Sequence, residues 1–147
     1  HEASWAAGLA FNNAGLGICH SNDHQLGAKF HVPHGLAWEI LLPYVVSYKA
    51  SKSPEALKKY ADVARKTGLA AHGMGDKIAV HHLTNYIKQM MREMHCPASL
   101  TAFGVDPSEA DKKCATIVAN AKKDATFPGN PVVPTDEDLA AIYQDAI

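Results

Sequence analysis

The sequence predicts an all-α protein, and two observations support that prediction. Apolar residues recur at intervals of three and four along most of the 147-residue chain, which is the spacing of one helix face. No stretch alternates apolar and polar residues over the length of a strand. We therefore expect a single domain over residues 1–147, long enough to bury a substantial core.

The first part of the chain predicts three helices separated by short breaks. The first covers residues 2–12, and its many Ala and Gly residues predict close packing against another helix. The second covers 18–26 and is followed by a loop over 28–33. The third is expected over 34–48. Pro43 should kink it or divide it in two, because proline removes a hydrogen bond from a helix interior.

The later helices are marked by residues that favour helix starts. Ser53 and Asp106 stand where an N-cap side chain is preferred, and Asp76 opens the helix between the two that they begin. Thr135 and Asp138 resemble a capping box for the last helix, after a proline-rich loop. For the helix that begins at Asp76, the predicted buried stripe consists of Val80, Leu83, Ile87, Met91 and Met94.

Composition argues against several classes of partner. The net charge is -1 and the lysines are scattered, so we expect no nucleic-acid partner. No apolar run approaches the ~20 residues of a membrane span, so no membrane partner is expected either. The three cysteines are far apart in the sequence. We interpret them as reduced thiols of a cytoplasmic protein and not as a disulfide framework.

Four of the nine histidines lie in one short segment, at His20, His24, His31 and His34. His20 and His24 are four residues apart, so on a helix they share one face. An isolated pair of this kind is often structural, but the concentration of four favours a metal site. Imidazole binds zinc, iron, copper and nickel, so the residue type does not choose the metal.

This segment resembles the signature region of iron-containing (group III) alcohol dehydrogenases. The runs that match in order and spacing are Phe11-Asn12-Asn13-Ala14, the His20/His24 pair, Leu26-Gly27, Pro33-His34-Gly35 and Leu41-Leu42-Pro43. Further along the chain, Pro97-Ala98-Ser99-Leu100 and Gly129-Asn130-Pro131 are also similar to family elements. The resemblance covers nearly the whole chain.

The resemblance implies a fold and a set of site residues. Residues 1–147 would form the C-terminal, metal-binding helical domain of the dehydroquinate synthase-like fold. His20 and His34 would be metal ligands, whereas helical spacing alone pairs His20 with His24. His24 would lie beside the metal as a catalytic proton-relay residue, and Phe11 would line the nicotinamide and substrate pocket. Thr126 stands where many members have Cys, which puts a role for that thiol in doubt.

The resemblance also implies a reaction and its cofactors. Hydride would pass between NAD or NADP and a small alcohol or aldehyde, with Fe2+, or alternatively Zn2+, acting as a Lewis acid. The family's other two ligands and its N-terminal nucleotide-binding α/β domain have no match here. We therefore expect a chain truncated at its N-terminus and inactive alone. Its exposed apolar surface should favour association with itself or with the missing part.

Two other function classes are alternatives to the dehydrogenase interpretation. One is a non-catalytic helical metal-binding or interaction fragment that retains the motif but has no turnover of its own. Nucleotide binding by the chain itself would discriminate between these two. The other is a helical metallohydrolase that uses a His-Asp dipeptide as adjacent ligands. No histidine in this sequence is followed by aspartate, which argues against it.

Overall fold

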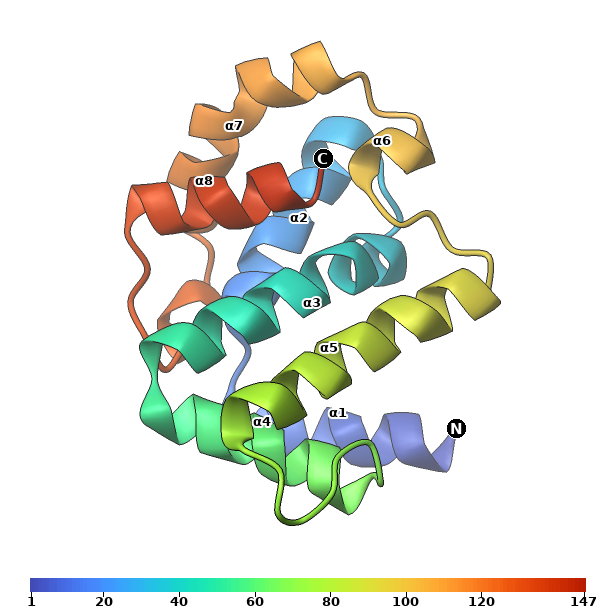
Figure 1. The fold of residues 1–147 in the computed structure, drawn as a ribbon. Helices are drawn as coiled ribbons and strands as arrows, with labels where there is room; N and C mark the ends of the chain where they lie inside the picture. The colour runs from blue at the N-terminus through green and yellow to red at the C-terminus, as the bar shows by residue number, and fades with distance from the viewer.

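The computed structural model describes residues 1–147, and its regular elements are all helices (Figure 1). The elements in chain order are α1 (Glu2–Ala14), α2 (Ile18–Phe30), α3 (His34–Lys52), α4 (Pro54–Lys66), α5 (Asp76–Glu93), α6 (Leu100–Phe103), α7 (Pro107–Ala121), a 3-10 turn η1 (Phe127–Gly129) and α8 (Asp136–Asp145). The predicted all-α class is confirmed. None of the helices combines the length and apolar character needed to cross a bilayer.

The helices enclose two adjoining hydrophobic cores that meet at α3. The larger core lies mainly between α2, α3, α7 and α8, and the smaller between α3, α4 and α5. Helix α3 contributes to both, because Leu41 and Val45 are buried in the larger core and Val46 in the smaller. Tyr143 is fully buried. Its hydroxyl donates to the Ala110 carbonyl oxygen at 2.9 Å, which satisfies a polar group that is costly to bury alone.

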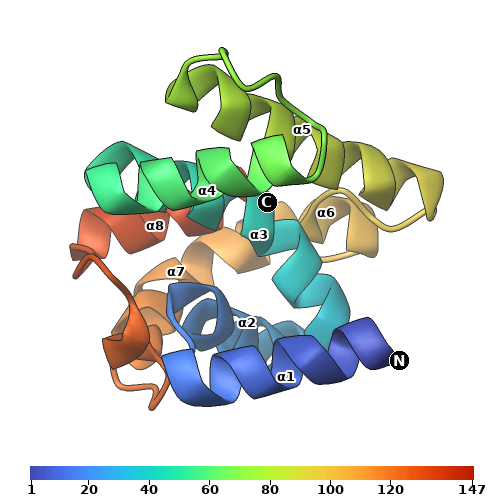
Figure 2. The same ribbon diagram turned by 90° about the horizontal axis from the view of Figure 1, so that it is seen from below.

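Helix α3 continues through Pro43, so the predicted alternative of two separate helices is wrong. In Figure 2 the axis of α3 changes direction along its length, as expected of a helix with an internal proline. Pro43 is buried, and its carbonyl oxygen accepts a hydrogen bond from Ser47 Oγ at 2.9 Å. Packing of α3 on both cores keeps the helix continuous where local propensity would end it.

Helix α2 extends to Phe30, which reduces the predicted loop over 28–33 to residues 31–33. The sequence interpretation ended this helix near Gly27, since glycine is the usual residue beyond a helix end. Instead His31 takes the left-handed conformation at φ 55°, and its N–H donates to the Gly27 carbonyl oxygen at 3.0 Å. The chain therefore turns only after a further turn of helix has formed.

Two predictions of burial are wrong. Val80 and Met91 are buried on α5, but Met94 is 53% exposed because the helix ends at Glu93, one residue before it. Helix α1 buries none of its residues, although its composition predicts close packing. It lies along one edge of the molecule (Figure 2) with Trp5 69% exposed.

The capping box of α8 is present as predicted and leads to a stability prediction. Thr135 Oγ1 accepts from the Asp138 N–H at 3.1 Å, and Asp138 Oδ2 accepts from the Thr135 N–H at 3.1 Å. We expect Thr135→Ala to lower the free energy of unfolding by about 0.5–2 kcal/mol, measured by urea denaturation. Ser108→Ala, at an exposed position of α7, is the control and should change it by less than about 0.5 kcal/mol. Equal losses in both variants would contradict a capping role.

Candidate metal centre

Two helices and the turn between them bring three imidazole rings together. His20 and His24 lie one turn apart on α2, and His34 is the first residue of α3. The ring centroid of His20 lies 5.5 Å from that of His34 and 6.2 Å from that of His24. The centroids of His24 and His34 are 5.9 Å apart. The two residues predicted to be metal ligands thus lie close together, with the predicted proton-relay residue beside both.

The tight turn after α2 places His34 opposite the face that carries His20. His31 reverses the chain through its left-handed backbone conformation, which is uncommon outside glycine. Pro33 follows at φ -57° and immediately precedes α3. His31 itself is exposed and caps α2, so this fourth histidine, which the sequence left without a role, has a structural one.

Two aromatic side chains border the three imidazoles. The ring of Phe11 on α1 lies 6.4 Å from that of His20, and the ring of Trp38 on α3 lies 6.2 Å from it. Phe11 is 48% exposed, so it stands at an open edge of the cluster. Sequence reasoning named Phe11 but missed Trp38. The signal for Trp38 was its position four residues after His34, on the same face of one helix.

Burial lowers the pKa of His20, and the neighbouring imidazoles of His34 and His24 lower it further. Asp124 acts in the opposite direction, but the net shift is downward. A lowered pKa keeps the imidazole neutral to lower pH. Neutral imidazole is the form that binds a metal ion, so the surroundings of His20 favour its use as a ligand.

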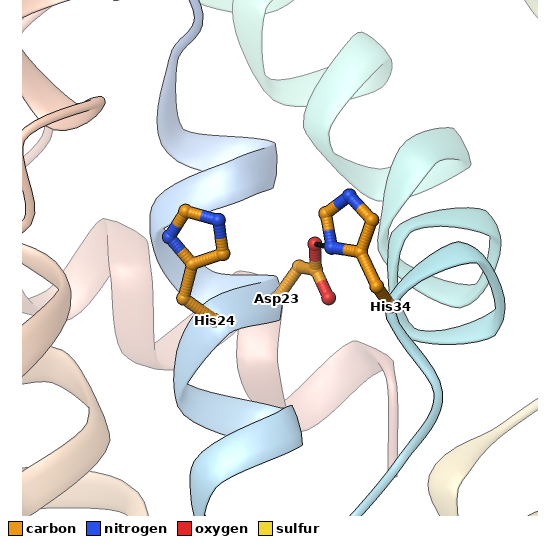
Figure 3. A group of neighbouring side chains, drawn as sticks. All are labelled: Asp23, His24 and His34. Atoms are coloured by element: carbon orange, nitrogen blue, oxygen red, sulfur yellow. Dashed lines mark ion pairs between the residues drawn. The ribbon is translucent and has the colours of Figure 1, made fainter.

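A buried carboxylate, Asp23, lies behind the imidazole cluster and was missed by sequence reasoning. Figure 3 shows it beside His34, and its Oδ2 forms a close ion pair with His34 Nδ1. The side chain of Asp23 is 1% exposed, whereas that of His34 is 62% exposed. Burial raises the pKa of Asp23 to about 6, although the imidazoles of His34 and His24 pull it downward.

A second carboxylate, Asp124, holds His24 from the other end of the chain. Asp124 Oδ2 lies 2.8 Å from His24 Nδ1. Its Oδ1 accepts from the Thr126 N–H at 2.9 Å and from Thr126 Oγ1 at 2.7 Å. Burial raises the pKa of Asp124, but the hydrogen bonds from Thr126 and His24 outweigh that effect and keep it below its usual value.

Thr126, at the position where many family members have Cys, therefore lies near the candidate site. It contributes there by donating hydrogen bonds to Asp124 from its hydroxyl and its backbone N–H. Asp124 could not be found from local spacing, because it is separated from His24 by 100 residues. A His Nδ1 held by a carboxylate has its other nitrogen, Nε2, free to face a ligand or a reacting group.

The donor set suits a first-row transition metal. Possible ligand atoms of Asp23, His24 and His34 all lie within 4.8 Å of one another. This group includes His34 but omits His20, so it differs from the predicted His20/His34 pair. Both sets are rich in imidazole, which suits iron and zinc. The geometry therefore fits a metal ion at this face of α2 and α3.

Comparison with known proteins gives one consistent result. The model of the "Fe-containing alcohol dehydrogenase family, C-terminal" matches residues 1–147. The chain is 37% identical over 144 residues to an NADPH-dependent butanol dehydrogenase of Clostridium saccharobutylicum, covering 98% of this chain and 36% of that protein. It is 36% identical over 147 residues to a 1-propanol dehydrogenase of Citrobacter freundii, covering 100% of this chain and 40% of the relative.

Solved structures agree with the sequence relatives. A 1,3-propanediol oxidoreductase superposes with a TM-score of 0.85 at 33% identity, over 96% of this chain and 35% of that one. An alcohol dehydrogenase from Oenococcus oeni gives a TM-score of 0.84 at 34% identity, with the same coverage of 96% and 35%. This chain thus spans little more than a third of these proteins. It belongs to the iron-containing alcohol dehydrogenase family, whose C-terminal part it matches along its whole length.

Proposed function

We propose that this chain is the metal-binding helical domain of an NAD(P)-dependent alcohol dehydrogenase that interconverts a small alcohol and its aldehyde. The observation that carries the proposal is the 5.5 Å separation of the His20 and His34 rings, which come from two helices. Family membership supports the reaction class, because the relatives act as alcohol dehydrogenases or aldehyde reductases by name. The nucleotide-binding part would lie outside residues 1–147.

His20 and His34 would hold the metal, which the family name gives as iron and which could be zinc on chemical grounds. We prefer this pair to the set of Asp23, His24 and His34, because the Asp23 carboxylate is already paired with Nδ1 of His34 and the family resemblance assigns His24 a proton-relay role beside the metal. A bound divalent ion supplies Lewis acidity at the alcohol or aldehyde oxygen. His20 stays neutral because its pKa is lowered by burial.

His24 would handle a proton beside the reacting oxygen. Its Nδ1 is held by Asp124 at 2.8 Å, so Nε2 is the nitrogen left to exchange a proton. Its side chain is 40% exposed, which gives the proton a path to water. Phe11 and Trp38 would supply apolar surface at the edge of the site, suited to the carbon chain of an alcohol or to the nicotinamide ring.

Metal binding by the 147-residue chain tests the ligand assignment. We expect a calorimetric titration with zinc or cobalt to show one site. His20→Ala and His34→Ala should each weaken binding at least ~10-fold, because loss of a ligand costs no less than loss of the group that orients it. His82→Ala, at an exposed position on α5, is the matched control and should bind as the wild type does. Unchanged affinity in both ligand variants, or an equal loss in the control, would overturn the assignment.

One observation supports a second function class, a helical fragment without turnover. Helix α1 has no buried residue and exposes Trp5, Leu9 and Phe11. Apolar surface of this kind is typical of contact regions. Binding of NAD or NADP to this chain alone would argue against such a fragment and for a self-sufficient enzyme.

A further inference from the structure

The carboxylate of Asp23 is buried without an evident structural purpose. Its side chain is 1% exposed, and its Oδ1 has no hydrogen-bond partner. Burying a carboxylate is costly unless it is paired and hydrogen-bonded, so an apolar residue at this point of α2 would serve folding better. The position of Asp23 is therefore better explained by the group that its carboxylate contacts than by a contribution to the stability of the core.

What Asp23 faces is one nitrogen of His34. Oδ2 makes a close ion pair with His34 Nδ1, but the contact is not a hydrogen bond of good geometry. His34 is the first residue of α3, and its side chain is 62% exposed. A surface imidazole at a helix start has rotamer freedom. A small rotation of this ring would align its Nδ1–H with the fixed, buried carboxylate.

We propose that Asp23 is a positioning residue that orients His34 for the metal, an inference that rests on the proposed function. By accepting the Nδ1–H of His34, Asp23 fixes the tautomer in which Nε2 carries the lone pair. In Figure 3, Nε2 of His34 lies on the side of the ring away from Asp23. Metal-binding histidines commonly donate their second N–H to a carboxylate in this way, which raises the basicity of the ligand.

Asp23 and Asp124 would thus each orient a different histidine. Asp124 reaches His24 from the turn after α7, whereas Asp23 reaches His34 from α2 itself. Direct binding of the metal by Asp23 is the rival interpretation, since its carboxylate oxygen lies within 4.8 Å of ligand atoms of His24 and His34. The two interpretations differ in the metal-free protein, because only a positioning residue sets the tautomer of His34 before metal arrives.

The first measurement is the tautomer of His34 in the metal-free, nitrogen-15-labelled chain at pH 8, obtained from long-range proton–nitrogen correlation spectra. We expect His34 to be protonated on Nδ1 in the wild type and mainly on Nε2 in Asp23→Ala. Asp23→Asn should retain the wild-type tautomer, because its amide oxygen can still accept the hydrogen bond. Asp23→Asn also keeps the shape of the side chain, so the test survives if Asp23→Ala fails to fold.

The second measurement is zinc affinity by calorimetry. We expect Asp23→Ala to weaken binding about 10–100-fold, the usual cost of losing a carboxylate that orients a histidine ligand. Asp23→Asn should weaken it less. The control is Ser21→Ala, which alters another fully buried polar residue of α2, whose hydroxyl donates a hydrogen bond to the Ile18 carbonyl oxygen.

Each outcome decides the inference. An unchanged His34 tautomer in Asp23→Ala would overturn it, as would an equal loss of affinity in Ser21→Ala. Failure of the proposed function is a separate result: His20→Ala and His34→Ala would then leave zinc binding unchanged, whatever the tautomer of His34.

Discussion

The 147-residue chain alone is expected to give no alcohol-dependent reduction of NAD or NADP, even with excess ferrous iron or zinc. Positioning of two reactants can be worth about 7–11 kcal/mol of the barrier, and hydride transfer requires the nicotinamide to be held against the substrate carbon. All regular elements here are helices, so no strand leads into a Gly-rich phosphate-binding turn. The two Gly-x-Gly runs, Gly15-Leu16-Gly17 before α2 and Gly73-Met74-Gly75 before α5, therefore follow no strand.

The measurement is a fluorescence assay for NADH or NADPH with several short primary alcohols. Nucleotide binding by calorimetry serves as a second readout, because absence of turnover alone could reflect a wrong choice of alcohol. In a protein that joins these residues to the proposed nucleotide-binding part, by contrast, His20→Ala or His34→Ala should abolish turnover, since each removes a proposed ligand. Metal-dependent production of NADH by the chain alone would show that its helices suffice for the chemistry.

The second large effect is expected at Gly129, in the 3-10 turn that packs against α2. A Cβ atom at this position would lie 1.9 Å from the Leu16 carbonyl oxygen and 3.0 Å from the Leu16 carbonyl carbon. Both atoms belong to backbone, so no side chain can rotate to relieve the clash. We expect Gly129→Ala to lower the free energy of unfolding by about 1–3 kcal/mol, the usual cost of overpacking, as measured by urea denaturation.

Gly35→Ala is the control for this substitution. An added Cβ at Gly35 meets nothing within 4 Å, and the residue is the second of α3. Alanine has a higher helix propensity than glycine, so this variant should be as stable as the wild type or more so. A Gly129→Ala protein of wild-type stability would mean that η1 and the backbone of Leu16, in the connection between α1 and α2, do not pack together as described.

Local signals were enough to predict most of the fold. The capping box at Thr135 and the N-caps Ser53 and Asp106 are confirmed, because each depends on a side chain and a backbone N–H two or three residues away. The errors come from tertiary context. Pro43 remains inside a helix because α3 is packed on both sides. The apolar Met94 lies beyond the end of α5 and stays exposed.

For the candidate site too, local sequence signals predicted some residues, whereas only the fold revealed the others. His20, His24 and His34 were predicted together because they lie within one short segment, and the structure brings their rings within 6.2 Å of one another. Their roles remain predictions. Asp124 was missed because nothing in its own segment links it to a histidine 100 residues earlier. Asp23 lay inside the segment, but only the fold reveals that it is buried against His34.

The contact between His24 and Asp124 has a consequence for the order in which this site assembles during folding. His20 and His34 are only 14 positions apart, so their meeting requires closure of a short loop by a local pair of helices. Joining residues 100 apart costs about 1.7 kcal/mol more in loop-closure entropy than joining residues 14 apart, from the logarithmic dependence on length. The paired imidazoles can thus form while the C-terminal third is still unstructured, and the carboxylate that holds His24 is added last.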